Sequence, residues 1–325
     1  MKNKFCLIFT ICIILTNFAK AQTAPSAVKS TYKNEFGFRS DNDSYLAQGS
    51  DMYYTNGLFI HFRHATKQEN LKENLEKKIF EISLGQKIYN PRSGYSPNPD
   101  RQDRPFAGYL YAGAALSWYS RKEGILKMAV ELGTTGPNSL AQAGQELLHN
   151  TIGFYELAGW EYQIKNEASI NLSAQYTKLI SRAEDNTVDV SFEGYANAGT
   201  TFNAAGAGFL FRIGRINQLF NSGATNSVIS NQQKTKSLMP RELFFYTRPQ
   251  LNYIIYDATA QGSMFNNDSP VTYGIQPIVF EQKLGLNYSS PRFTFDFGVY
   301  LRTKEVRSKA PGHQFGSISL YYRFD

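Results

Sequence analysis

Alternation of apolar and polar positions is the dominant pattern of this chain. Leu58, Ile60 and Phe62, for example, alternate with positions that include His61 and Arg63. A period of two residues is typical of strands whose two faces lie in different surroundings. The pattern predicts twelve strands, near residues 34–43, 53–64, 79–87, 107–120, 124–134, 168–180, 187–200, 202–213, 242–257, 273–288, 291–304 and 314–324.

The abundance of aromatic residues indicates where these strands lie. The chain contains 24 Phe and 21 Tyr, and no stretch beyond its first residues approaches the apolar length of a membrane-spanning helix. This favours an all-β fold, a transmembrane antiparallel β-barrel, over a secreted β-sandwich. In the last segment Ile318, Leu320, Tyr322 and Phe324 share one face. Such a strand resembles the C-terminal signal of bacterial outer-membrane barrels, although Asp325 follows the aromatic residue here.

The parity of the strand number decides one ambiguous segment. Residues 156–164 could form a thirteenth strand. Single-chain bacterial barrels have even strand numbers, because both termini lie on the periplasmic side. We therefore assign this segment to a loop and expect about 12 strands.

Twelve strands sort the connections into two sets at opposite ends of the barrel. The periplasmic set comprises residues 65–78, 121–123, 181–186, 214–241 and 289–291, with a charged helix expected in 65–78 and a long excursion at 214–241. The extracellular set comprises residues 44–52, 88–106, 135–167, 201, 258–272 and 305–313.

The start of the chain has the features of a secretory signal peptide. Lys2 and Lys4 precede an apolar run, and Ala19-Lys20-Ala21 supplies a small-x-small cleavage site. The domains expected are a signal peptide at 1–21 and an outer-membrane barrel at 22–325.

Cysteine content and charge narrow the chemistry. The only two cysteines, Cys6 and Cys12, fall within the signal peptide, so the mature chain has no disulfide, Cys-zinc site or Cys nucleophile. The net charge of +7 suits an anionic partner such as phosphorylated lipid.

Three predicted extracellular loops carry residues suited to chemistry. The first contains Ser-Asp-Asn-Asp at 40–43 and Tyr-Thr-Asn-Gly at 54–57, although turn formation alone explains many Asp and Asn residues in a loop. The second contains Asp103-Arg104, for which a simple ion pair at the rim is the alternative. In the third, Asn138 or Ser139 can cap a short helix from Leu140 to Asn150.

The helix in the third loop places Gln145 and His149 at positions i and i+4, on one helical face. Because the three loops share one end of the barrel, Asn42, Asp43, Thr55, Gln145 and His149 could converge. A histidine base with nearby donors is what ester hydrolysis requires. A hard cation would select the carboxylate and amide oxygens of the first loop, whereas zinc at His149 is the alternative metal site.

Six motifs in register give a family resemblance. Besides the two motifs of the first loop, they are Gly-Gln-x-x-Tyr-x-Pro at 85–91, Asp-Arg-Pro-Phe-Ala-Gly-Tyr at 103–109, Gly-Pro at 136–137 with Gln-x-x-x-His at 145–149, and Gly-Trp-x-x-Gln at 159–163. Together they resemble the LpxR family of outer-membrane lipid A 3′-O-deacylases. The resemblance implies a twelve-stranded barrel that uses Ca²⁺ and removes the 3′-acyloxyacyl group of lipid A.

The resemblance also implies roles for individual residues. Asn42 and Asp43 match the family's Asn-Asp pair, with Asp43 as a ligand of calcium. Thr55 matches a catalytic-site Thr or Ser, His149 the general base, and Gln145 its neighbour one turn earlier. The family's acidic residue after the His has no clear match at Tyr155 or Glu156. No motif secures a counterpart of the family's site Lys, for which Lys87 is the candidate.

The resulting expectation is a monomeric, calcium-dependent ester hydrolase of the outer membrane. Its site faces outward, its substrate is lipopolysaccharide, and it has no nucleic-acid partner. A phospholipase-like esterase and a non-catalytic porin or structural barrel are the alternatives.

Overall fold

The computed structural model describes residues 31–46, 51–67, 71, 73–231 and 236–325, so the expected signal peptide at 1–21 lies outside the described residues. The described chain forms one closed antiparallel barrel. Its strands are β1 (Asn34–Asn42), β2 (Tyr53–Ala65), β3 (Leu75–Asn90), β4 (Ala107–Ser120), β5 (Gly124–Thr135), β6 (Glu167–Arg182), β7 (Val188–Gly199), β8 (Phe202–Arg215), β9 (Glu242–Asp257), β10 (Ile278–Ser289), β11 (Phe293–Arg302) and β12 (His313–Phe324).

The helical elements are short and lie in the connections. They are the α-helices α2 (Ala141–Ile152) and α3 (Ala258–Gln261), and the 3₁₀ helices η1 (Asp43–Leu46), η2 (Pro99–Arg101), η3 (Pro137–Ser139), η4 (Trp160–Tyr162), η5 (Leu219–Asn221) and η6 (Gly223–Thr225). Within the described ranges, no helix has the length and apolar character needed to cross a membrane.

The barrel closes because β1 pairs with both β2 and β12. Asn34 lies opposite Phe324, and the register continues to Asn42 opposite Gly316. Side chains then alternate between the outer wall and the lumen, as expected for a strand. On β5, Leu126 and Met128 are exposed on the outer wall, whereas Lys127 between them reaches Glu81 of β3 across the interior. The outer wall is therefore apolar and the lumen polar, which is the arrangement of a membrane barrel.

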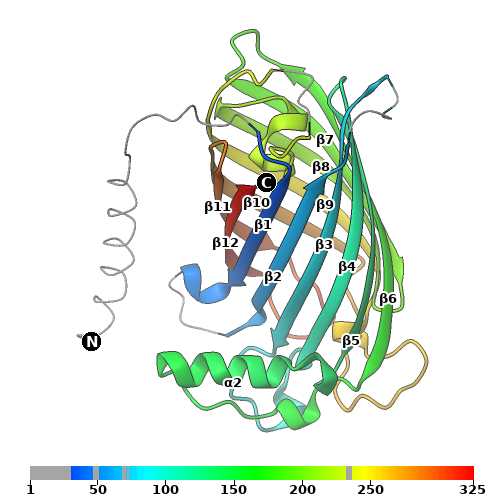
Figure 1. Cartoon of the computed structure of the whole chain (residues 1–325). Coiled ribbons are helices and arrows are strands. Elements are labelled where there is room, and N and C mark those ends of the chain that lie inside the picture. The colour runs from blue at the N-terminus through cyan, green and yellow to red at the C-terminus, as the bar shows by residue number, and fades with distance from the viewer. Residues whose placement is uncertain (1–30, 47–50, 68–70, 72, 232–235) are drawn as a thin grey trace. The chain divides into compact units, whose positions relative to one another are not determined.

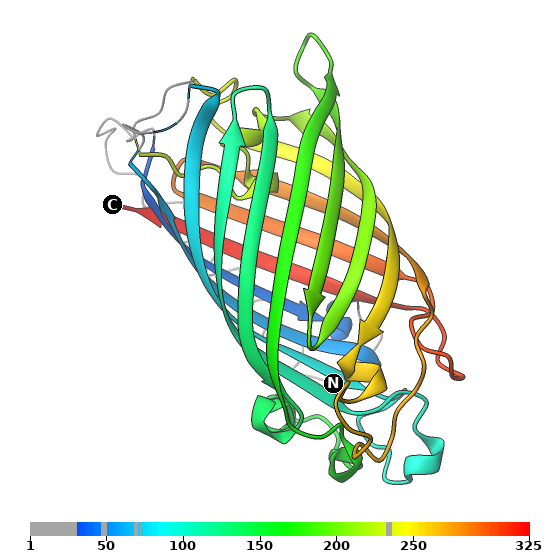
Figure 2. The same ribbon diagram turned by 90° about the vertical axis from the view of Figure 1, so that its right-hand side faces the viewer.

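The two ends of the barrel differ. In Figures 1 and 2, β1 begins and β12 ends at the same end, which we call the terminal end. The helix α2 and the long loops lie at the opposite end, which we call the loop end.

A segment that we call the plug, residues 216–230, folds into the lumen at the terminal end. Ile216, Leu219, Phe220 and Ile229 pack against inward side chains of several strands, including Ile79 of β3 and Phe244 of β9. This is an extended hydrophobic cluster inside the barrel. The sequence predicts a long periplasmic connection at 214–241. Its apolar residues are instead buried inside the barrel at the terminal end.

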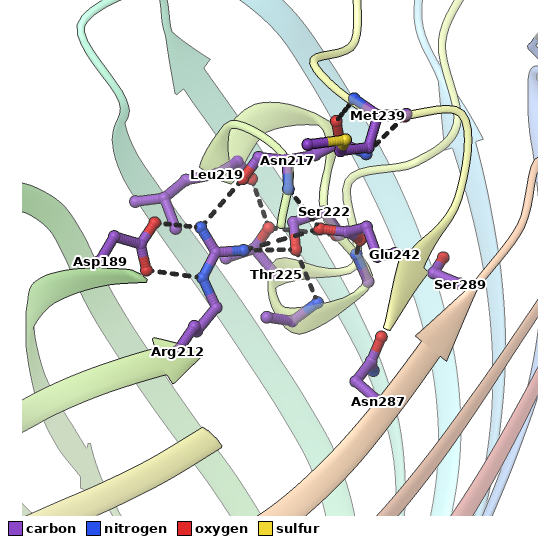
Figure 3. Close-up of polar contacts among 12 residues, drawn as sticks. Asp189, Arg212, Asn217, Leu219, Ser222, Thr225, Met239, Glu242, Asn287 and Ser289 are labelled. Atoms are coloured by element: carbon purple, nitrogen blue, oxygen red, sulfur yellow. Dashed lines mark hydrogen bonds and ion pairs between the residues drawn. The ribbon is translucent and has the colours of Figure 1, made fainter. Parts of the chain in front are cut away.

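Ion pairs and hydrogen bonds hold the plug in place (Figure 3). The guanidinium of Arg212 donates hydrogen bonds to Asp189 on the neighbouring strand, to the Ser222 hydroxyl and to the Asn217 carbonyl. Glu242 accepts from the backbone N–H groups of Asn217 and Gly223, at 2.8 and 2.7 Å. On β3, the Lys77 ammonium donates to the side chain of Asn221 and to the carbonyls of Ser227 and Ile229. Buried charges are therefore paired or hydrogen-bonded, as the interior requires.

The predicted twelve strands are confirmed, and so is the loop at 156–164, which contains η4 and one isolated bridge at Ala158. The expected helix in 65–78 is wrong for all described residues of this segment. Ala65 belongs to β2, residues 75–78 belong to β3, and residues 66–67, 71 and 73–74 are not helical. Residues 68–70 and 72 lie outside the described part of the chain. The charged residues of this stretch suggest an exposed segment. Lys77, however, is buried inside the barrel, where residues of the plug accept its hydrogen bonds.

Candidate active site

A groove on the outer wall, between the barrel and α2, is lined by two of the five predicted site residues, Asn42 and Gln145. On β1, Phe36 and Phe38 are exposed to the outside, so Ser40 and Asn42 continue the same outward face. These two residues line the groove together with Asn56 and Leu58 of β2, and Gln145 and Leu148 of α2 cover it. Its volume is about 420 Å³. The groove therefore lies on the side of the wall that faces lipid, and not in the lumen. Asp43, Thr55 and His149 are buried and do not line it.

A β-bulge sets the position of Thr55. The register between β2 and β3 shifts between Tyr54 and Asn56, and Tyr53 just before it has a left-handed φ of 60°. A bulge turns a side chain away from the direction it would take in a regular strand. The hydroxyl of Thr55 consequently lies 3.4 Å from the Oδ1 of Asp43.

Asn42 and Asp43 lie where β1 passes into η1. The Oδ1 of Asn42 accepts from the Ser44 N–H at 2.6 Å, and its amide donates to Asn56. The carboxylate of Asp43 accepts from the Met52 N–H at 2.8 Å. Burial, together with the nearby carboxylate of Asp51, raises the pKa of Asp43 to about 7.

Asp51 is a site residue that the sequence interpretation missed. Asp51 is 6% exposed, and its carboxylate contacts Thr55, Tyr155 and His149. Its Oδ1 accepts from Thr55 at 3.1 Å, and its Oδ2 accepts from the Tyr155 hydroxyl and lies 3.2 Å from the Nε2 of His149. In sequence this residue looks like part of a turn. Its position ahead of a strand in the same hairpin as Asp43 is the signal that could have singled it out.

The ends of α2 are fixed by backbone conformation. Leu140 adopts a left-handed φ of 57° at the N-cap with no side-chain cap, so the predicted capping by Asn138 or Ser139 is wrong. Ser139 instead donates to the Gly136 carbonyl. At the other end, Gly153 with φ of 71° caps the helix and turns the chain back toward His149.

His149 is almost fully buried, at 2% exposed. Its Nδ1 lies 2.8 Å from the backbone carbonyl of Tyr155, which can only accept, so Nδ1 carries the proton and donates. The Nε2 atom lies within ion-pair distance of Asp51 but is not aligned for a hydrogen bond, and it has no other partner among the described residues. The lone pair on Nε2 is therefore not engaged in a hydrogen bond with any described residue.

Gln145 lies one turn before His149 and is fully buried. Its Oε1 accepts from the indole N–H of Trp160 at 3.1 Å, which fixes the direction of the amide. The Nε2 has no hydrogen-bond partner within the described ranges. Because Gln145 lines the groove, this amide is a donor left for a bound molecule.

The remaining candidates do not lie at this site. Lys87 lines a separate polar cavity of about 380 Å³ together with Glu131 and Arg302, while its neighbour Gln86 lines the outer groove. Glu156 is exposed, and the Tyr155 carbonyl contacts His149 instead.

The simple ion pair at the rim, the alternative interpretation of Asp103 and Arg104, is not present. Asp103 accepts from the Tyr53 hydroxyl at 2.9 Å, and Arg104 donates to the hydroxyl of Thr259. Both residues support the loops around the site. Gly108 in the same motif allows β4 to approach α2, because a Cβ there would lie 2.3 Å from that of Ala141.

Comparisons with known proteins agree with the barrel fold. The family model described as "Outer membrane protein LpxR" matches residues 7–324. Among solved structures, LpxR from Salmonella typhimurium superposes with a TM-score of 0.72 at 18% identity, covering 89% of this chain and 100% of that one. The beta domain of the Bordetella autotransporter BrkA reaches a TM-score of 0.50 at 10% identity, covering 90% and 100% of the two chains.

At these identities, the structural matches speak for the barrel fold alone. None of the curated proteins compared with this chain is significantly similar to it. The family model, however, spans nearly the whole sequence. The chain therefore belongs to the LpxR family of outer-membrane proteins.

Proposed function

We propose that this protein hydrolyses an ester-linked acyl group of lipid A, the 3′-acyloxyacyl group, in the outer leaflet of the outer membrane. One observation carries the proposal: Gln145, whose Nε2 has no hydrogen-bond partner among the described residues, lines a groove on the lipid-facing wall, and His149 lies one helical turn away on the same helix, α2. An acyl chain can reach such a groove without leaving the membrane. The loop end then faces outward, where lipopolysaccharide is found.

His149 supplies the base. Its Nδ1 donates to the Tyr155 carbonyl, so Nε2 takes the proton from water as the water oxygen attacks the ester carbonyl carbon. The tetrahedral intermediate collapses with cleavage of the bond to the sugar oxygen. His149 returns the proton to that oxygen, and the fatty acid leaves. The Nε2 of Gln145 is placed to donate a hydrogen bond to the bound ester.

The residues around Asp43 fit a calcium ion. The carboxylates of Asp43 and Asp51 are buried together, and no lysine or arginine of the described chain forms an ion pair with Asp43. Hard oxygen ligands of this kind suit calcium. Calcium held there would supply positive charge that stabilises the oxyanion.

The described residues contain no group of three His, Cys, Asp or Glu side chains close enough to hold a metal alone. Calcium commonly draws further oxygen ligands from backbone carbonyls, amides and water. Zinc would require a tighter set of nitrogen or sulfur ligands, so the donor set favours calcium over zinc at His149.

The fold also bears on the alternative functions. A porin needs an open lumen, but the plug occupies the lumen between β3 and β9 at the terminal end. A structural barrel needs no buried base beside unpaired donors. Both features favour an enzyme. A phospholipase-like esterase shares the same chemistry and differs only in the lipid bound.

Mass spectrometry of lipid A from cells with and without the protein tests the proposal. Loss of one acyloxyacyl unit only when the protein is present is the expected result. Release of lysophospholipid with unchanged lipid A would favour the phospholipase. Unchanged lipids together with conductance in planar bilayers would favour the channel.

A further inference from the structure

We propose that Asp51 is a second carboxylate ligand of the calcium at Asp43 and that the same carboxylate connects this cation to His149. The inference rests on the proposed function, because it concerns the calcium invoked there. It assigns a role to a residue that lies outside the motif positions of the family resemblance.

The first observation is the shared hydroxyl of Thr55. Its single proton faces two carboxylate oxygens, the Oδ1 of Asp51 at 3.1 Å and the Oδ1 of Asp43 at 3.4 Å. One hydroxyl can donate to only one of them at a time. The amide of Asn56 adds a donor to Thr55 itself, at 3.3 Å, and not to the carboxylates. The Thr55 hydroxyl therefore cannot donate to both carboxylates, and one of the two Oδ1 atoms is left without its hydrogen bond.

The second observation is the charge balance. Asp43 and Asp51 are 3% and 6% exposed, and the ion pairs of the described chain give them no lysine or arginine partner. A buried charge is costly unless it is paired or coordinates a metal. His149 can offset at most one of the two charges, whereas a divalent cation offsets both.

The third observation is that the two carboxylate oxygens of Asp51 contact different groups. Oδ1 faces Thr55 and the side of Asp43, while Oδ2 faces the Tyr155 hydroxyl and the Nε2 of His149. A ligand carboxylate that also contacts a second group can fix the position of that group relative to the metal. In this arrangement Asp51 holds the base at a fixed place beside the cation, and Tyr155 holds Asp51.

The environment of His149 also supports a bound cation. The Nε2 of His149 has no hydrogen-bond partner within the described part of the chain, and the residue is 2% exposed. This Nε2 lies 3.2 Å from the Oδ2 of Asp51, while the Oδ1 of the same carboxylate accepts from Thr55. A buried imidazole and two buried carboxylates, to which the described residues supply no other counter-ion, form a site that is complete only when a ligand is bound.

Calcium binding to the purified full-length protein in detergent, measured by isothermal titration calorimetry after chelator treatment, tests the inference. Asp43→Asn and Asp51→Asn should each weaken binding by about tenfold to 100-fold or more, since each removes one ligand charge. Asp100→Asn is the matched control, because Asp100 is an exposed carboxylate on a loop at the same end. It should bind calcium as the wild type does. Heat-modifiable migration on gels shows that each variant is folded.

His149→Ala separates a ligand role of Asp51 from a role in orienting His149 alone. It should leave calcium affinity within about threefold of wild type, because His149 contacts the other oxygen of Asp51. Normal calcium binding by folded Asp51→Asn, with binding lost in Asp43→Asn, would overturn the inference and leave the proposed function standing. Absence of calcium binding by the wild type would instead overturn the calcium in the proposed function, and the inference with it.

Discussion

The Nδ1 of His149 and the backbone carbonyl of Tyr155 lie 2.8 Å apart. The carbonyl oxygen comes from the turn that follows α2, so the end of the helix fixes the tautomer of its own histidine. The proton on Nδ1 leaves Nε2 as the basic atom. A backbone carbonyl, and not an acidic side chain, therefore sets this tautomer.

Removal of His149 tests the base. His149→Ala should lower turnover by roughly 10²–10⁴, the usual range for loss of a general base. The barrel should still insert, because α2 lies outside the strand ladder. Rate measurement on the purified variant, with its migration on unheated gels as the control, checks this. Near-normal turnover by a folded variant would contradict the role.

Gln145 should contribute less, through its unpaired amide. Gln145→Ala removes the donor and should lower turnover by about tenfold to 100-fold. Gln145→Glu keeps an oxygen for Trp160 but loses the donor, so it should be impaired as well. Trp160→Phe is the informative comparison, since it frees the amide to rotate. If Gln145→Glu worked as well as the wild type, the amide would not be a donor to substrate.

Thr55 should act through its hydroxyl and not through its shape. Thr55→Val keeps the volume but leaves Asp43 and Asp51 without their shared donor. We expect calcium affinity and turnover to fall together by about tenfold, in line with loss of one charge-assisted hydrogen bond. Thr55→Ser should retain both properties. Equal behaviour of the Val and Ser variants would show that the hydroxyl has no role.

Acid should oppose calcium binding. The pKa of Asp43 is raised to about 7 by burial, so a proton competes with the cation below that pH. The apparent calcium affinity measured at pH 8 should therefore fall as the pH drops through 7. An affinity that does not change between pH 8 and 6 would argue against Asp43 as a ligand.

The stability of the chelated protein should change in the opposite sense. The folded-state pKa of Asp43 lies above the ordinary value of an aspartate, so the charged form destabilises the fold. Thermal unfolding in chelator should shift upward as the pH falls from 8 toward 5. Asp43→Asn should flatten this dependence, and added calcium should give its largest stabilisation at high pH. A wild-type profile identical to that of Asp43→Asn would contradict the assignment.

The plug should keep the barrel closed to ions. Reconstituted wild-type protein should show no steady conductance in planar bilayers. Replacement of residues 217–229 by a short Gly-Ser linker removes the groups that Arg212 and Lys77 hold and should open a pore. Porin-like conductance of the wild type would show that the plug does not seal the lumen.

The strands could be predicted from the sequence because their outer faces must be apolar and their inner faces polar. The ends of the strands are less well marked in the sequence. β10 begins at Ile278 and not near 273, since only an isolated bridge at Ile275 pairs the preceding residues. The start of β3 was hidden because Lys77 is charged yet buried, and its partners lie in the plug, far away in sequence.

The site was only partly visible in the sequence for a related reason. Gln145 and His149 share a helical face, so their proximity follows from spacing alone. Asp51 meets His149 only when the first and third loops are packed together. The bulge that aims Thr55 and the left-handed Leu140 that starts α2 carry no residue type that signals them.

The most direct test of the central claim uses purified protein and defined lipid A in detergent micelles with calcium. Mass spectrometry of the products follows both the lipid and the released acid. We predict loss of one 3′-acyloxyacyl unit by the wild type and intact lipid A with folded His149→Ala. Intact lipid A with the folded wild-type protein, or equal release by His149→Ala, would contradict the account.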